Sequence, residues 1–98
     1  MRNMGSVPDY RITPYPNPSR SQVHIRYNVP VAANVQVRVY DIVGRACRTL
    51  VTGRQRPGRY NLVWDQRDDR GRQLAAGVYF CRVEANGESR QRKMVVAR

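Results

Sequence analysis

Apolar and polar residues alternate one by one along much of the chain, and no stretch has the spacing of an amphipathic helix. The clearest run lies at residues 22–30, where every second residue is apolar and Pro30 closes the run: Val23, Ile25, Tyr27 and Val29. Successive side chains of a strand point to opposite faces, so these four share one face. The pattern predicts a half-buried strand.

The same alternation continues through the middle of the chain. Valine at every second position of residues 35–39 predicts another strand, and Asp41 with Gly44 then supplies turn chemistry. Residues 44–53 predict an irregular short strand, because arginine and threonine interrupt their apolar residues. Charged side chains are typical of edge strands, so we expect this one at a sheet edge.

A turn at residues 56–58 precedes a strand in which Tyr60, Leu62 and Trp64 share a face. We expect the single tryptophan to be the largest core residue. Residues 66–73 are polar and predict an exposed loop.

The chain ends in a predicted hairpin. Gly77 begins an apolar strand, and residues 90–97 pair back onto it. Asn86 and Gly87 between them tolerate the positive φ angles of a type I′ turn, which is the commonest tight hairpin turn.

About seven short strands with frequent turns and no helix predict an all-β fold, an immunoglobulin-like antiparallel β-sandwich. At 98 residues the chain is expected to form one domain. We assign residues 15–98 to the sandwich and residues 1–14 to a leader or linker. Residues 1–6 are either native or a leader added for expression, and the sequence does not separate these alternatives.

A net charge of +11 raises nucleic acid or an anionic surface as a partner. The basic residues are dispersed over several strands and loops, and seventeen of the eighteen are arginine. Recognition of nucleic acid needs clustered cations with interleaved aromatic residues. We therefore favour a solvated basic surface, with no specific nucleic-acid partner and weak contact with anionic surface glycans or lipids.

No arrangement of residues indicates catalysis, a metal site or a cofactor. His24 occupies an outward strand position without a nucleophile in a recognisable context, so we expect an exposed strand residue and no enzyme activity. Asp65, Asp68 and Asp69 precede Gly71 as in some calcium loops, but no closing glutamate follows and arginines intervene. A polar turn is the favoured interpretation.

Cys47 and Cys81 both fall on predicted inward faces. A disulfide between them is one alternative, and two small buried thiols are the favoured one.

The order of the motifs resembles the type A C-terminal sorting domains of type IX secretion cargo and the related immunoglobulin-like domains of the flagellar hook-capping type. No single motif is specific, but the ordered set is, and it covers most of the chain. Its positions here are Tyr15, Pro16, Asn17, Pro18, Tyr40, Asp41, Gly44, Trp64, Asp65, Gly71, Gly77 and Tyr79. Pro16 and Pro18 predict a rigid extended segment, which acts either as a spacer or as cover for a sheet edge.

The resemblance implies a non-catalytic domain that directs a larger exported bacterial protein through the outer membrane to the cell surface, after periplasmic transit. It also implies that the final hairpin, residues 78–98, is read by the secretion translocon. The residues that carry this implied recognition are Lys93, Met94, Val95, Val96 and Arg98. The alternative is a structural module that assembles with copies of itself or with neighbouring domains.

Overall fold

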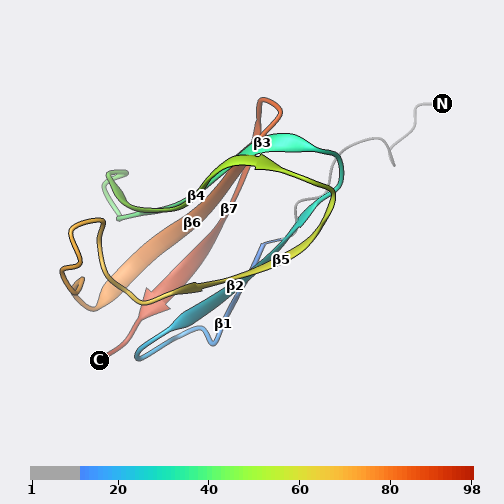
Figure 1. The fold of residues 1–98 in the computed structure, drawn as a ribbon. Coiled ribbons are helices and arrows are strands. Elements are labelled where there is room, and N and C mark those ends of the chain that lie inside the picture. Colours follow the sequence, from blue (N-terminus) through green and yellow to red (C-terminus); the bar gives the residue numbers. More distant parts are fainter. Residues whose placement is uncertain (1–11) are drawn as a thin grey trace.

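A computed structural model of the chain describes residues 12–98, so the alternatives for residues 1–6 lie outside the described part. It contains seven strands: β1 (Thr13–Tyr15), β2 (Val23–Val29), β3 (Ala33–Tyr40), β4 (Ala46–Gln55), β5 (Gly58–Trp64), β6 (Gly77–Ala85) and β7 (Glu88–Val96). They form a three-stranded sheet of order β1-β2-β5 and a four-stranded sheet of order β4-β3-β6-β7. All pairings between these strands are antiparallel. The predicted all-β, immunoglobulin-like sandwich is confirmed (Figure 1).

The core fills the space between the two sheets. The alternating apolar residues of β2, β3 and β6 supply most of it, as their pattern predicts. Trp64 is fully buried and is the largest such side chain, and its ring meets Tyr79 edge to face at 5.8 Å. The expected role of the tryptophan is confirmed.

Two element boundaries differ from the prediction. Thr13 and Pro14 belong to β1 and pair with β2, and Ile12 is 3% exposed, so the sandwich begins before residue 15. β4 has ten residues and is not short, although it lies at a sheet edge as expected. Its pairing with β3 contains two register shifts, which break the alternation of apolar residues by which a strand is recognised.

The β6–β7 turn has the predicted conformation. Asn86 has a φ of 53° and Gly87 a φ of 76°, which are the two positive values that a type I′ turn requires. The hairpin extends through the whole of both strands, from the pair Ala85–Glu88 to the pair Gly77–Val96.

Cys47 and Cys81 are free, so the disulfide alternative is wrong for this structure. They lie on β4 and β6, which flank β3 in the same sheet. Strands are about 4.8 Å apart, which separates the two backbones by roughly 9.6 Å, whereas a disulfide needs Cα atoms within about 7 Å. Burial raises the pKa of the Cys81 thiol to about 12, which keeps this thiol protonated.

Candidate functional site

The residues implied in recognition lie on β7, at one edge of the four-stranded sheet, and just beyond it. Met94 and Val96 are 1% and 2% exposed and belong to the core. Lys93 and Arg98 are exposed, and Val95 is half-buried. The Arg98 guanidinium donates to the Leu74 carbonyl. A partner of the folded domain can therefore contact Lys93, Val95 and Arg98, but not the side chains of Met94 and Val96.

Asn17 binds the outer edge of β7 with its side-chain amide. Its Nδ2 donates to the Lys93 carbonyl at 3.0 Å, and its Oδ1 accepts from the Val95 N–H at 2.9 Å. The amide thus replaces the backbone of a missing neighbouring strand. Of the two interpretations of the segment around Pro16 and Pro18, the structure supports cover for a sheet edge.

Ser19 covers the next part of the same edge with its backbone N–H and carbonyl groups. Its N–H donates to the Val95 carbonyl at 2.9 Å, and its carbonyl accepts from the Ala97 N–H at 2.7 Å. The Gln66 side chain is fully buried, and its Nε2 donates to the Ser19 carbonyl at 3.1 Å. Placing Gln66 in an exposed loop was wrong, because this contact links residues that are far apart in the sequence. The sequence carries no periodic signal for either residue.

Replacing Asn17 by alanine is expected to lower the free energy of unfolding by about 1–3 kcal/mol, because two backbone groups of β7 lose their partner. The amides of Val95 and Ala97 should then exchange with solvent faster, which NMR can measure. Asn61→Ala is a suitable control, because Asn61 is exposed on β5 and is not a neighbour of β7. Unchanged exchange at Val95 would contradict the role given to Asn17.

The turn between β3 and β4 is closed by Asp41. Its Oδ1 accepts from the N–H groups of Val43 at 3.0 Å and Arg45 at 2.9 Å, and its Oδ2 pairs with the Arg45 Nε at 2.9 Å. Gly44 has a φ of +89°, which an L side chain rarely adopts. This geometry explains why aspartate, glycine and arginine occur at this spacing.

The loop between β5 and β6 repeats the turn with the same spacing. Asp68 Oδ1 accepts from the N–H groups of Arg70 and Arg72, both at 2.9 Å, and Oδ2 pairs with the Arg72 Nε at 3.2 Å. Gly71 has a φ of +82°. Residues 41–45 and 68–72 therefore form two copies of one Asp-x-x-Gly-Arg turn at the same end of the molecule.

Both turn carboxyls should make stability depend on pH. The Arg45 N–H lowers the pKa of Asp41, and the Arg72 N–H lowers that of Asp68, each below the ordinary value of 3.8. A depressed folded-state pKa gives stability that is present above the unfolded value and lost as pH falls through the folded value. The urea midpoint of unfolding should stay level from neutral pH to about pH 5 and decrease below about pH 4. Asp41→Asn and Asp68→Asn together should flatten this decrease, and an unchanged slope would contradict the assignment.

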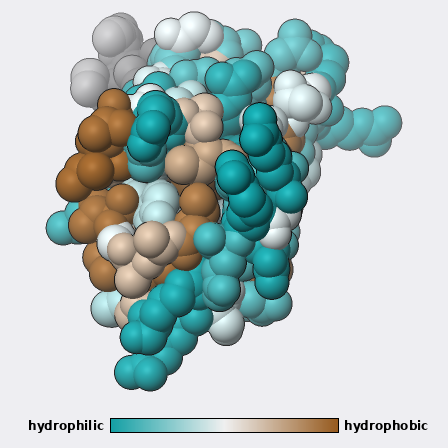
Figure 2. All heavy atoms as spheres, turned by 90° about the vertical axis from the view of Figure 1, so that its left-hand side faces the viewer, coloured by the Kyte–Doolittle hydropathy of each residue, from teal (hydrophilic) through white to brown (hydrophobic). Residues whose placement is uncertain are grey.

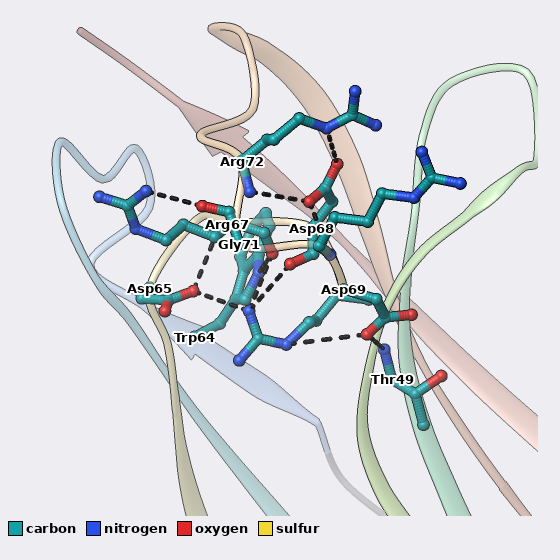
Figure 3. A network of polar contacts seen from close by, with 10 residues as sticks. Thr49, Trp64, Asp65, Arg67, Asp68, Asp69, Gly71 and Arg72 are labelled. Atoms are coloured by element: carbon teal, nitrogen blue, oxygen red, sulfur yellow. Dashed lines mark hydrogen bonds and ion pairs between the residues drawn. The ribbon is translucent and has the colours of Figure 1, made fainter.

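Arg48 of β4 organises the loop after β5. Figure 3 shows this loop with Asp65, Arg67 and Asp69. Its Nη1 donates to Asp65 Oδ1 at 2.9 Å and to the Arg67 carbonyl at 3.0 Å. The Trp64 indole N–H donates to the same carbonyl at 3.0 Å. The loop is therefore tied to both sheets, because Trp64 ends β5 and Arg48 belongs to β4.

Asp69 binds the outer edge of β4 as Asn17 binds that of β7. Its N–H donates to the Cys47 carbonyl at 3.0 Å, and its Oδ1 accepts from the Thr49 N–H at 3.0 Å. Both edges of the four-stranded sheet are thus partly covered by loop residues, which blocks strand pairing there. The loop carboxylates are bound by arginine and backbone donors, and residues 12–98 contain no group of three or more potential metal ligands of the His, Cys, Asp and Glu types.

His24 was expected to be exposed, but the structure places it in a half-buried position. The register pairs it with Tyr15, and the two rings stack at 5.1 Å, which leaves His24 half-buried. Its Nδ1 is buried and has no hydrogen-bond partner among the described residues. A short strand that the sequence did not reveal accounts for this difference.

Positive charge is unevenly compensated over the structure. At the end with the two Asp-x-x-Gly-Arg turns, arginines pair with Asp41, Asp65 and Asp68. Ile42 and Val43 project there with 72% and 70% of their surface exposed, and Figure 2 shows hydrophobic atoms beside long polar side chains on this face. Elsewhere in the described residues the only acids are Glu84 and Glu88, which pair with Arg82 and Arg90. Most of the net charge therefore lies along the strands.

A search of curated proteins gave no match. The family model of the FlgD Ig-like domain matches residues 18–89. The chain belongs to the FlgD Ig-like domain family. The matched range includes β2 to β6 and both Asp-x-x-Gly-Arg turns, but it ends before residues 93–98. Membership of the FlgD Ig-like family therefore rests on the sandwich and not on the terminal residues.

Two solved structures contain regions similar to this FlgD Ig-like domain, both from Porphyromonas gingivalis. Dimeric latent PorU is 26% identical with a TM-score of 0.66, over 92% of this chain and 9% of that one. PorZ, described as an essential bacterial surface component of the type-IX secretion system, is 25% identical with a TM-score of 0.63 over 89% of this chain and 11% of that one. The domain thus spans about a tenth of each protein. Among residues 12–98, no helix is long and apolar enough to cross a membrane.

Proposed function

We propose that this domain is a non-catalytic sorting or anchoring module that directs a larger exported bacterial protein through the outer membrane to the cell surface. The observation that carries the proposal is the similarity to PorZ over 89% of the chain, since PorZ is described as a surface component of the type-IX secretion system. The partner would be a protein of the secretion machinery, reached after transit through the periplasm.

The site of recognition in this proposal is the end of β7 and the residues beyond it. Lys93 and Arg98 present positive charge, and Val95 presents a half-buried apolar side chain. Asn17 and Ser19 hold the backbone of this segment in one conformation. A partner would thus meet a preorganised surface, which reduces the entropy lost on binding.

The test is delivery of a reporter fused to the domain in a bacterium with type IX machinery. Deleting residues 93–98 is unsuitable, because the deletion removes core residues Met94 and Val96. Lys93→Glu with Arg98→Glu should instead abolish surface delivery while circular dichroism stays unchanged. Arg54→Glu with Arg56→Glu makes the same charge change at exposed positions and should leave delivery intact. Normal delivery of the Lys93 and Arg98 variant would refute the proposed site.

A structural module is the second candidate, and one observation favours it. The family match ends at residue 89, so the part of the chain that defines the family lacks the terminal residues. Such a module would associate with itself or with neighbouring domains. Sedimentation of the purified domain tests self-association. An apparent molecular mass that rises with protein concentration would support it, whereas a constant monomer mass would contradict it.

Contact with anionic surface glycans or lipids is a weaker part of the proposal, supported by the uncompensated positive charge on the strands. The proposal includes no specific nucleic-acid partner. Binding to DNA or RNA that persisted at about 0.15 M salt would contradict this, since binding by phosphate contacts alone weakens steeply with salt.

A further inference from the structure

The outer edge of β7 is covered only in part. The Lys93 carbonyl and both backbone groups of Val95 point away from β6, since Asn17 and Ser19 bind them. The β6–β7 register has no shift, and backbone direction alternates with a period of two. The N–H groups of Ser89, Gln91 and Lys93 therefore also point outward. In residues 12–98, none of these three has a hydrogen-bond acceptor on that side.

The same stretch is exposed on both of its faces. Every residue from 89 to 93 is exposed. Arg90 and Arg92 pair with Val83 and Cys81, whose side chains are buried, so the two arginines stand on the core-facing side of the sheet. Both side chains are nevertheless exposed.

The outward carbonyls of this stretch are bound by these same arginines. Arg90 Nη1 donates to the Ser89 carbonyl at 3.0 Å, and Arg92 Nη1 donates to the Gln91 carbonyl at 3.3 Å. Arg90 Nη2 also pairs with Glu88 Oε1 at 3.5 Å. All three contacts are exposed and join residues one or two apart, so an incoming strand can replace them. Its N–H groups would take the carbonyls, and its carboxylates would take the guanidinium groups.

We propose that residues 89–93 form a docking edge for an extended acidic peptide segment, which adds a strand to β7 and pairs carboxylates two residues apart with Arg90 and Arg92. Strand addition supplies backbone hydrogen bonds, and side chains at alternate positions supply specificity. Opposite charges directly across two strands stabilise a pairing, and like charges oppose it.

Charge selects this occupant over a second copy of the chain. Two β7 edges paired antiparallel about Gln91 would set Arg90 of each copy against Arg92 of the other. That arrangement places like charges directly opposite each other. The covered end of β7 also fixes the limit of docking, because Asn17 and Ser19 already occupy the edge from the Lys93 carbonyl onward.

This docking edge deepens the proposed function, since it names the chemistry of a partner for the same terminal strand. The titration below uses the purified domain without secretion machinery. If the peptide does not bind, the docking edge is contradicted and the proposed sorting function is not. If the peptide binds but the reporter is not delivered, the sorting function is contradicted and the docking edge is not.

The test is an NMR titration of the full chain with a blocked Thr-Glu-Thr-Glu-Thr peptide, beside a matched Thr-Lys-Thr-Lys-Thr peptide. The glutamate peptide should shift the amide signals of Ser89, Gln91 and Lys93 and slow their exchange, and the lysine peptide should not. Equal shifts with both peptides, or none with either, would overturn the proposal.

Two variants separate backbone pairing from charge. Gln91→Pro removes an outward N–H without removing a β6–β7 hydrogen bond, and should weaken binding at least about tenfold with an unchanged fold. Arg90→Glu with Arg92→Glu should weaken the glutamate peptide about tenfold and create binding of the lysine peptide. Arg54→Glu with Arg56→Glu carries the same charge change away from β7 and should bind normally. The docking edge would be refuted if the Arg54 and Arg56 variant lost as much affinity for the glutamate peptide as the Arg90 and Arg92 variant. It would also be refuted if the Arg90 and Arg92 variant did not bind the lysine peptide.

Discussion

Replacing Met94 by alanine is expected to lower the free energy of unfolding by about 2–5 kcal/mol. Met94 is 1% exposed and lies in the core cluster between the two sheets. Removing most of its side chain leaves a cavity that the packed neighbours fill only partly. Small domains are stable by roughly 5–15 kcal/mol, so the variant should be largely destabilised. Urea unfolding followed by circular dichroism measures the change.

The Met94 variant also tests how the terminal residues act. Met94→Leu keeps the volume and apolar character and should cost less than about 1.5 kcal/mol. Under the proposed function, Met94→Leu should retain surface delivery, while Met94→Ala should lose it through unfolding. A folded Met94→Leu protein that is not delivered would show that a partner reads the methionine directly, against its burial.

Replacing Trp64 by alanine should lower the free energy of unfolding by about 3–5 kcal/mol. The indole is fully buried, contacts the Tyr79 ring and donates to the Arg67 carbonyl. The loss therefore combines a large cavity with the removal of one of the two hydrogen bonds to the Arg67 carbonyl, which keeps only the bond from Arg48. Thermal unfolding measured by calorimetry should show a midpoint lowered by more than about 10 °C.

A control for Trp64 lies next to it on the same strand. Val63 is 47% exposed on the outer face, so Val63→Ala should change the free energy of unfolding by less than about 0.5 kcal/mol. Trp64→Phe should fall between the two variants, because it keeps apolar volume but loses the N–H donor. Equal stability of Trp64→Ala and Val63→Ala would contradict the central position of the indole.

Loop residues cover parts of both edges of the four-stranded sheet. Asn17 and Asp69 each use a side chain and a short loop to occupy backbone groups of an edge strand. Exposed edges promote pairing between molecules, so such cover opposes association at Cys47 and Thr49 of β4 and at the end of β7. Within residues 12–98, no such cover lies on the outward N–H groups of residues 89–93, and that stretch is where we place a specific partner.

The sequence by itself determined the strands from β2 to β7, the hairpin turn and the fold class, but not β1. These features depend on local rules: alternation with a period of two, glycine or asparagine where φ is positive, and apolar residues facing one core. Val23 to Val29 and the Asn86–Gly87 turn are examples in which prediction and structure agree. The resemblance to a known family was likewise visible in the spacing of conspicuous residues.

Only the tertiary structure decided which of the terminal residues are accessible and what holds the edges. Cys47 and Cys81 are separated by β3, Gln66 is buried against Ser19, and Asn17 lies on β7, and each fact joins parts of the chain that are distant in sequence. Local patterns report the period and propensity of one segment. They do not report how the two sheets are placed against each other or where a loop crosses a sheet edge, because these depend on how all seven strands pack together.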